Sequence, residues 1–364
     1  MQNRVNTIQR KLKNTNIDAL FITSPYNISY LSGVFPSSIE EREYYLILTH
    51  SNIYLLAPKM FLLAISDRKK YFEYREITAK KGLFTHIQDI CKTENIRSFG
   101  FEKYNLRYAE FEHLKSALKD PELFALEDFV ESFRTIKTAD EIEKTKRACE
   151  ITDNCYKEIL GDIKIGVTER EIASKIEFYC NSYGKNAFPA IVAFGGNAAI
   201  PHHIPGNTKL ENNSFILFDF GAKHEGYCSD MSRTIYFGKP NEREITLYNT
   251  VLEAQNLALQ KLKEWHRDDF KMSHLHTIAE NHIKKMGLPT FPHSLGHGLG
   301  LEVHEYPSIS KYSEGNELRE NMIITIEPAI YVPEIGGVRI EDDVLLSSSG
   351  YEILTHSPKE LTIL

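Results

Sequence analysis

The stretch "LFDFGAKHEGYCSDMSRT", residues 217–234, has the pattern of a β-hairpin that carries two aspartates. Asp219 follows the apolar run FILF, and Asp230 lies on the returning strand. A turn centred between His224 and Glu225 would set the two carboxylates opposite each other, where like charges destabilise a sheet. Solvent-facing positions would also relieve the repulsion, but the flanks FILF and TIYF leave no clear solvent face. A shared divalent cation removes the conflict, so the hairpin predicts a metal site.

A second cluster of candidate ligands is "FPHSLGHGLGLEVHE", residues 291–305, with three histidines interleaved with glycines. Neutral imidazole is a common ligand for transition metals, and glycine lets the backbone approach a site closely. The glycines also argue against a helix, which excludes the helical HExxH arrangement of zincins. A single histidine here would favour a structural role, whereas the cluster favours a functional one.

Two glutamates complete the set. Glu327 in "ITIEPAIY" and Glu341 in "GVRIEDDVLL" each interrupt apolar strand sequence, as the two aspartates do. Pro328 ends the strand beside Glu327, a position that suits a ligand and equally a surface residue. Four acids and a histidine that break apolar strands supply the bridging carboxylates that two metals about 3.5–4 Å apart require.

The whole chain has the composition of a globular protein and is long enough for two or three domains. It has 364 residues, of which 42% are hydrophobic and 26% charged, and a net charge of −7. This charge disfavours nucleic-acid binding, and no apolar run is long enough for a membrane helix. Five scattered cysteines without a CxxC pair, and an N-terminus without an apolar signal core, predict a cytoplasmic protein with reduced thiols.

The pattern along the chain predicts two domains. Residues 1–127 alternate helix and strand, with a hairpin in "YYLILTHSNIYLLAP", and contain no catalytic cluster. Residues 128–364 begin with two helices, each opened by a capping box at Thr138 and Thr168. β-patterns follow from about residue 187, interrupted by a helical stretch between about 243 and 287. Because two strand pairs each carry two acids beside a glycine-bearing turn, an internal duplication is indicated.

These motifs resemble those of the pita-bread metallopeptidases, a family that includes aminopeptidase P, prolidase, methionine aminopeptidase and the non-peptidase creatinase. The resemblance covers nearly the whole chain and includes the linker "RTIKTADEI". It implies a creatinase-like α/β N-terminal domain and an α+β pita-bread catalytic domain with pseudo-two-fold symmetry. It also implies the ligand set Asp219, Asp230, His297, Glu327 and Glu341.

The resemblance assigns roles to these ligands. Asp219 binds one metal, His297 and Glu327 bind the other, and Asp230 and Glu341 bridge the two. A hydroxide between the metals attacks the scissile carbonyl, with Glu327 as proton shuttle.

Further roles follow for residues that do not bind metal. His304 donates to the developing oxyanion or the peptide, and His202 contacts the substrate or takes part in proton transfer, with His203 as the local alternative. The remaining substrate residues are His293, near the prolyl ring, and Arg339, which can anchor a carboxylate. Thr234 supports the site, although plain strand roles remain open for Thr234 and Arg339.

The oxygen-rich ligand set favours Mn²⁺, with Co²⁺ or Zn²⁺ as alternatives. The histidines resemble those of proline-specific peptidases, so we expect an Xaa-Pro aminopeptidase or Xaa-Pro dipeptidase that acts on small peptides as a homodimer. The two activities stay open, because Ser308 in "HEYPSISKY" stands where prolidases of similar length carry an arginine. A creatinase-type hydrolase and a non-catalytic binding protein are the alternatives from other classes, and the complete ligand set argues against both.

Overall fold

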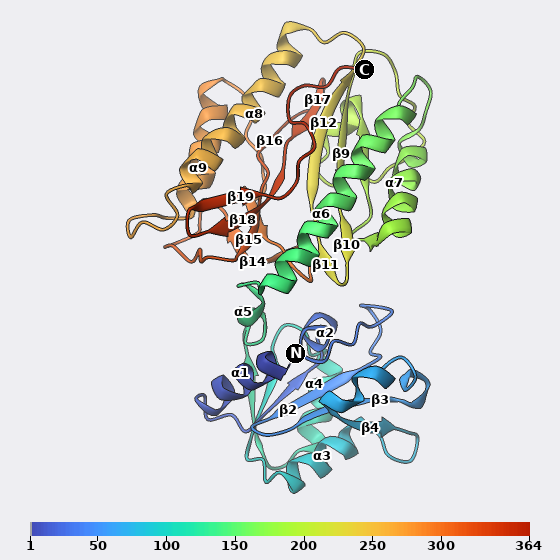
Figure 1. Ribbon diagram of the computed structural model, residues 1–364, viewed down its shortest axis with the longest axis vertical. Coiled ribbons are helices and arrows are strands. Elements are labelled where there is room, and N and C mark those ends of the chain that lie inside the picture. The colour runs from blue at the N-terminus through green and yellow to red at the C-terminus, as the bar shows by residue number, and fades with distance from the viewer. Residues whose placement is uncertain (1) are drawn as a thin grey trace. The chain divides into compact units, whose positions relative to one another are not determined.

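The computed structural model describes residues 2–364, and the chain divides into two compact units that meet in sequence at Arg134 and Thr135. In the first unit, one mixed sheet has the strand order β4-β3-β2-β1-β5-β6 (Figure 1). Its strands are β1 (Ala19–Ile22), β2 (Tyr45–Thr49), β3 (Ile53–Pro58), β4 (Glu73–Ile77), β5 (Ser98–Glu102) and β6 (Glu122–Leu126). Its helices are α1 (Gln2–Lys13), α2 (Pro25–Ser32), α3 (Leu83–Thr93), α4 (Tyr108–Ala117) and α5 (Glu131–Arg134), with the 3₁₀ helices η1 (Lys59–Phe61) and η2 (Ser66–Tyr71).

The α/β character expected for this unit is confirmed. β1 is buried along its whole length because it lies between β2 and β5 and has apolar side chains only. The strand stops before Ser24, whose hydroxyl caps α2, and Pro25 occupies the first helical turn, where its missing N–H costs nothing. The expected hairpin is the antiparallel pair β2–β3.

The second unit consists of two halves with the same order of elements. The first half has α6 (Ala139–Ile159), α7 (Glu169–Tyr183), β8 (Ile191–Phe194) and an interrupted hairpin of β9 (Ser214–Phe220), β10 (Ala222–His224), β11 (Tyr227–Cys228) and β12 (Met231–Phe237). The second half has α8 (Glu242–Leu262), α9 (Ser273–Lys285), β13 (Gly296–Gly298) and an interrupted hairpin of β15 (Ile323–Ile326), β16 (Ala329–Val332), β17 (Gly336–Arg339) and β18 (Asp342–Ser347). The smaller elements are η3 (Leu160–Asp162), β7 (Lys185–Asn186), η4 (Gly195–Ala199), β14 (Glu305–Ile309) and β19 (Gly350–Ile353). The indicated duplication is therefore present as a repeated order of elements.

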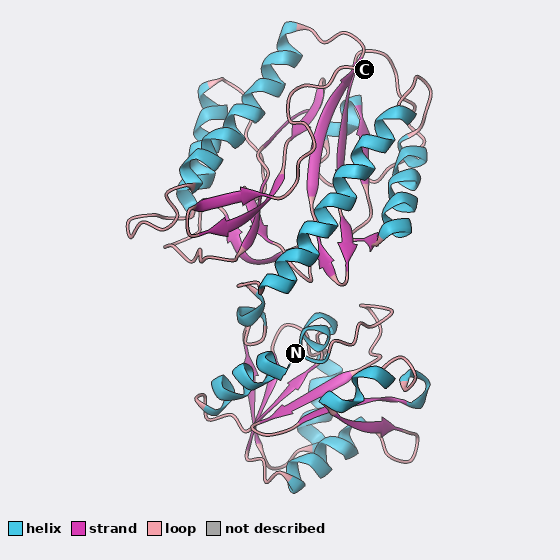
Figure 2. Cartoon of the chain, in the orientation of Figure 1, coloured by secondary structure: helices cyan, strands magenta, loops and turns pink. Residues whose placement is uncertain are grey.

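The helices of each half cover the outer face of that half's sheet, and the strands lie between the two helix pairs (Figure 2). Tyr156 of α6 packs on Phe218 of β9, and Val251 of α8 belongs to the same buried cluster as Ile324 of β15. Both expected capping boxes are present, Thr138 with Glu141 and Thr168 with Glu171. None of the described helices is long and apolar enough to cross a membrane.

The register expected for the first hairpin is wrong, because the turn lies one residue later and each residue pairs with a partner two positions further along the returning strand. Asp219 pairs with Ser232, and the turn is centred between Glu225 and Gly226. These two residues have φ values of 46° and 92°, the positive angles that a two-residue type I′ turn requires. Asp219 and Asp230 are therefore diagonal neighbours on one face, a separation that leaves room for an ion between them.

Candidate metal centre

The four acids lie at or beside the interruptions of the two long hairpins. Asp219 is the second-last residue of β9, and Asp230 lies in the gap between β11 and β12. Glu327 lies in the gap between β15 and β16, and Glu341 in the gap between β17 and β18. The equivalent places in the two halves therefore contribute the acids in matching pairs.

The second hairpin keeps one register across its interruption. The ladder of β15 with β18 and the ladder of β16 with β17 count along the same pairing, which places Glu327 opposite Glu341. Pro328 has no N–H to donate to the ladder, so regular pairing stops at this point. Glu327 and Glu341 therefore lie opposite each other at the point where the ladder is interrupted.

Ser232 and Arg233 of β12 join the two hairpins. The backbone N–H of Glu341 donates to the carbonyl of Ser232 (3.1 Å), and the Ser232 hydroxyl donates to the Glu341 carboxylate (2.8 Å). Arg233 pairs with Asp342 at 2.7 Å, and both side chains are almost fully buried. Loss of one partner of such a pair would leave a buried charge. Arg233 also donates to the Glu341 carbonyl, so it helps to fix Glu341 between the halves.

His297 lies on β13 between two glycines that the packing requires. A Cβ at Gly296 would lie 1.9 Å from the Thr325 carbonyl oxygen, and one at Gly298 would lie 2.2 Å from that of Tyr306. The neighbouring chains therefore approach the histidine from both sides, as the glycines in the sequence predict. The Nδ1 of His297 lies 3.1 Å from the Gly298 carbonyl and must donate to it, which leaves Nε2 as the ring nitrogen that can bind a metal.

All five predicted ligands come together. The Nε2 of His297 lies 3.4 Å from the Glu327 carboxylate and 3.7 Å from that of Asp230. Three overlapping groups have ligand atoms within 4.8 Å of one another: Asp230, His297 and His304; His297, Glu327 and Glu341; and Asp219, Asp230 and Glu341. In each of the three acids of the last group, one buried carboxylate oxygen has no hydrogen-bond partner among the described residues. Unpartnered buried oxygens beside an available imidazole nitrogen are the donors that divalent metals bind, so the residues fit the ions implied by the sequence.

The electrostatics of the site lead to the same conclusion. Burial and the nearby Asp219 together raise the pKa of Glu341 to about 8, against the opposing effects of Arg339 and Ser232. Burial and the neighbouring acids also raise the pKa values of Asp230 and Glu327 well above their ordinary range. Burial and the neighbouring His304 lower the pKa of His297 to about 4, so its imidazole is neutral. Acids that repel one another beside a neutral imidazole form a site that a cation stabilises.

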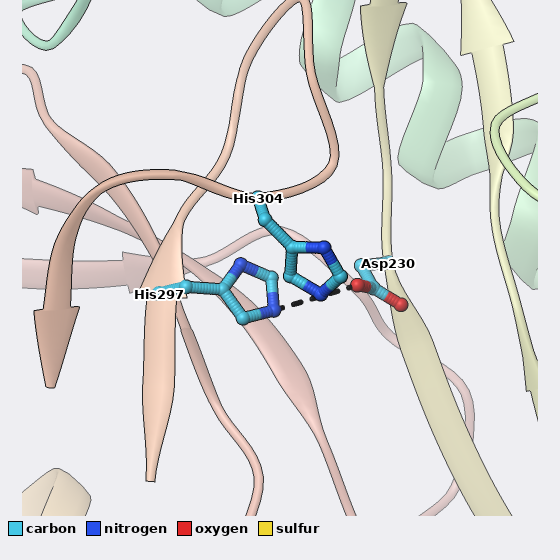
Figure 3. A group of neighbouring side chains, drawn as sticks. All are labelled: Asp230, His297 and His304. Atoms are coloured by element: carbon cyan, nitrogen blue, oxygen red, sulfur yellow. Dashed lines mark ion pairs between the residues drawn. The ribbon is translucent and has the colours of Figure 1, made fainter. Parts of the chain in front are cut away.

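His304 lies beside His297 at the edge of the ligand group. The two rings have centroids 4.4 Å apart and are inclined by 70°, and Figure 3 shows both imidazoles pointing toward Asp230. His304 is exposed, unlike its neighbour. Partial burial of its ring lowers the pKa of His304, although the nearby Asp219 raises it. The residue therefore presents an imidazole to the ligand group and to the outside of the site.

His293 and Arg339 are linked through a tyrosine that sequence reasoning missed. The Tyr331 hydroxyl lies 3.0 Å from His293 Nε2 and accepts a hydrogen bond from Arg339 Nη1 at 2.7 Å. Arg339 also donates to Asp219 and, through Nε, to the Ser232 hydroxyl. The prediction that Arg339 binds a substrate carboxylate stays a prediction, and it would require the guanidinium to exchange or share one of these partners.

The other predicted residues occupy two further places. His202 is exposed, and it lies close enough to His293 and His304 for its charge to lower the pKa of each. His203 is turned to Glu169, whose carboxylate lies 2.9 Å from its Nε2. Thr234 is buried, and its hydroxyl donates to the Arg339 carbonyl and accepts from the Arg339 N–H, both at 3.1 Å.

Three residues that contribute to the site are not among those predicted from the sequence. Ser232 and Tyr331 are ordinary strand residues, and only their long-range pairing brings them to the acids. Asp343 follows two other acids in the sequence, yet it is fully buried and its carboxylate accepts the N–H of Asp230 at 2.9 Å. An acid within an apolar strand was the one available signal for Asp343.

Comparison with known proteins identifies the family. Residues 143–348 match the model of metallopeptidase family M24, and residues 4–136 match that of the creatinase/prolidase N-terminal domain. An uncharacterized peptidase of Staphylococcus aureus is 39% identical over 98% of this chain and 99% of its own length. The structure of an Xaa-Pro dipeptidase from Bacillus anthracis matches with a TM-score of 0.90 and 31% identity over 100% of this chain and 99% of that one. That of an X-Pro aminopeptidase from Thermotoga maritima matches with a TM-score of 0.87 and 31% identity over 98% and 100%. The chain belongs to metallopeptidase family M24, and a creatinase-type N-terminal domain precedes its pita-bread domain in the sequence.

Proposed function

We propose that this metallopeptidase hydrolyses the bond between an N-terminal residue and a following proline, with two divalent metal ions bound by Asp219, Asp230, His297, Glu327 and Glu341. The observation that carries the proposal is the set of unpartnered carboxylate oxygens around an available imidazole nitrogen. The structural relatives named as Xaa-Pro dipeptidase and X-Pro aminopeptidase support the choice of substrate.

Mn²⁺ is the proposed metal, with Co²⁺ and Zn²⁺ as ions that the site would also accept. Four carboxylates and one imidazole make a hard, oxygen-rich donor set, which suits manganese better than the thiolate-rich sites typical of structural zinc. Such ions polarise a carbonyl and make a water molecule acidic enough to serve as a nucleophile near neutral pH.

The side chains around the ligands supply the remaining chemistry. Glu327 lies between His297 Nε2 (3.4 Å) and His293 Nδ1 (3.9 Å), so its carboxylate can take the proton of the attacking water and pass it to the leaving nitrogen. His304 is placed to donate to the oxygen on which negative charge develops. His202 is proposed to contact the same peptide from the exposed side of the site.

His293 and its neighbours form the proposed contact surface for the prolyl ring. Phe291 lies beside His293 with ring centroids 5.3 Å apart, and Tyr331 packs against the histidine at 5.9 Å. Burial lowers the pKa of His293 to about 4, so a neutral ring faces the substrate. A surface of uncharged rings suits a pyrrolidine, and a proline nitrogen in a peptide bond has no hydrogen that would need an acceptor.

We expect the enzyme to cleave Ala-Pro and Ala-Pro-Ala with kcat/KM values within about tenfold of each other, a difference of about 1.4 kcal/mol. The reason is Ser308 of β14, which is exposed and hydrogen-bonded to Ser294. A long cationic side chain at this position would bind the free carboxylate of a dipeptide, and serine provides no such charge. Rates with Mn²⁺ under matched conditions test this.

The control peptide is Ala-Ala-Ala, which replaces the pyrrolidine by a methyl group. We expect it to be cleaved roughly 100-fold more slowly, since each missing methylene in a fitted pocket costs about 1–3 kcal/mol. Equal rates on Ala-Ala-Ala and Ala-Pro-Ala would contradict the proline specificity.

The proposal further includes a homodimer and a cytoplasmic location. None of the described residues of the N-terminal domain belongs to the ligand groups, and the proposed role of this domain is to shape the substrate opening of a second copy. All five cysteines are free and buried, as suits a reducing compartment.

A further inference from the structure

Glu169 is a buried acid outside the ligand set that binds one segment from several directions. It is the first residue of α7, and its side chain is completely buried. Its carboxylate accepts four hydrogen bonds of 2.8–3.0 Å, all from residues 194–206: the backbone N–H groups of Phe194 and Gly206, Asn197 Nδ2 and His203 Nε2. A carboxylate accepts only, so His203 must be the donor in its pair.

The helix itself does not need this carboxylate. Thr168 and Glu171 already form the capping box of α7, and the exposed Glu171 side chain accepts from Thr168. Burial would raise the pKa of Glu169, but the hydrogen bonds from Asn197, His203 and the two backbone amides outweigh it, so the pKa is lowered. Glu169 is thus an ionised, buried group whose four carboxylate hydrogen bonds all come from the 194–206 segment.

The 194–206 segment contacts two residues of β17 that lie beside the ligand group, Arg339 and Gly337. The Pro201 carbonyl accepts from Arg339 Nη1 at 3.2 Å, and Arg339 in turn donates to Asp219. The segment also presses on β17, since a Cβ at Gly337 would lie 2.0 Å from the Ala198 carbonyl oxygen. His202 follows Pro201 directly and precedes His203, so hydrogen bonds on both sides fix the backbone that carries it.

We propose that Glu169 is a positioning residue that holds His202 at the substrate opening by fixing the 194–206 segment through its four hydrogen bonds. This inference rests on the proposed function, in which His202 contacts the peptide. Glu169 belongs to none of the ligand groups, and its proposed action is through His202.

The first test is independent of catalysis. Hydrogen exchange of the Mn²⁺-loaded full-length protein is compared in wild type, Glu169→Gln and Glu171→Gln. A glutamine amide cannot accept from all four donors, so we expect the amides of residues 194–206 to exchange at least about tenfold faster in Glu169→Gln. Glu171→Gln changes the cap of the same helix and should leave this segment unchanged. Unaltered exchange in Glu169→Gln would overturn the proposal.

The second test is a double-mutant cycle on kcat/KM for Ala-Pro-Ala. Glu169→Gln should lower kcat/KM by about 10–100-fold, the usual range for outer partners of functional groups. In a His202→Ala background the same change should cost no more than about twofold, because interacting sites are not additive. Equal losses in both backgrounds would overturn the proposal, since a purely structural role predicts them.

Asn197→Ala provides a milder variant, in case Glu169→Gln folds poorly. It removes one of the four donors, and we expect a loss of about threefold in kcat/KM in the native background and none with His202→Ala. A loss that persists with His202→Ala would again contradict the proposal. If wild type cleaves neither Ala-Pro nor Ala-Pro-Ala, the proposed function fails, and the exchange experiment alone decides the role of Glu169.

Discussion

Asp230→Ala is expected to abolish peptide cleavage and to prevent retention of two metal ions per chain. Asp230 belongs to two of the three ligand groups, and Asp343 accepts a hydrogen bond from its backbone N–H. Its carboxylate is therefore held where both groups need it. Loss of an outer partner already costs about 10–100-fold, so loss of this bridging ligand should cost more than about 10³-fold in kcat/KM. Metal analysis and peptide assays on the same preparation measure both effects.

The pH dependence of the stability of the metal-free protein provides a second test of the acid cluster. Glu341 has a folded-state pKa of about 8, above the ordinary value of 4.5, so its ionisation destabilises the folded state as pH rises between these values. Asp219 is the neighbouring acid that raises this pKa, so removing its charge in Asp219→Asn reduces this cost. This titration covers roughly pH 5 to pH 8. Over that range the melting temperature of the metal-free wild type should therefore fall more than that of the variant.

A matched control is Glu352→Ala, which removes an exposed acid of β19 whose carboxylate pairs with Lys146 at the surface. It should keep both metals, full activity and the pH dependence of wild type, because exposed ion pairs contribute little. If Asp230→Ala retained two metals and normal activity after chelation and reloading, the bridging role would be disproved.

His304→Ala is expected to lower kcat by about 10²–10³-fold, or about 2.7–4 kcal/mol, while both metals stay bound. The physical reason is that the His304 imidazole, which packs against the His297 ring, can donate a hydrogen bond to the oxygen that becomes negative in the transition state. As His304 is itself exposed, its removal should leave the melting temperature of the metal-loaded protein within about 1–2 °C of wild type.

Three measurements on the purified variant separate this role from its rivals. A lower melting temperature with normal kcat would indicate a structural histidine, and a lower metal content would indicate that His304 is itself a ligand, which its closeness to Asp230 and His297 permits. His356→Ala, an exposed histidine in the C-terminal segment, is the control and should change none of the three. Normal kcat on Ala-Pro-Ala would show that the donor role is wrong.

The ligand set was predictable because charge is conspicuous where a strand should be apolar. Asp219, Asp230, Glu327 and Glu341 each interrupt an apolar pattern, and the glycines beside His297 indicate a close backbone approach that the structure confirms. The alternation of helices and strands and the two capping boxes were readable for the same reason, since both depend on local sequence.

The hairpin register and the hydrogen bonds among the site residues could not be predicted from the sequence. The hairpin register depends on which two residues adopt positive φ, and "KHEGY" permits more than one choice until the flanking strands pair. Tyr331 and Ser232 are chemically ordinary for strands, so their hydrogen bonds to Arg339 follow only from tertiary packing. The four partners of Glu169 lie 25 or more residues away in sequence, so no local pattern reveals them.

The most direct test of the central claim is a metal titration of the chelated protein, in which bound Mn²⁺ and the rate of Ala-Pro cleavage are measured together. A dinuclear site predicts no cleavage without metal, and a rate that rises with loading and levels off when two ions are bound per chain. Cleavage of Ala-Pro that persists undiminished in metal-free protein, or that is complete when no more than a trace of metal is bound, would contradict the account.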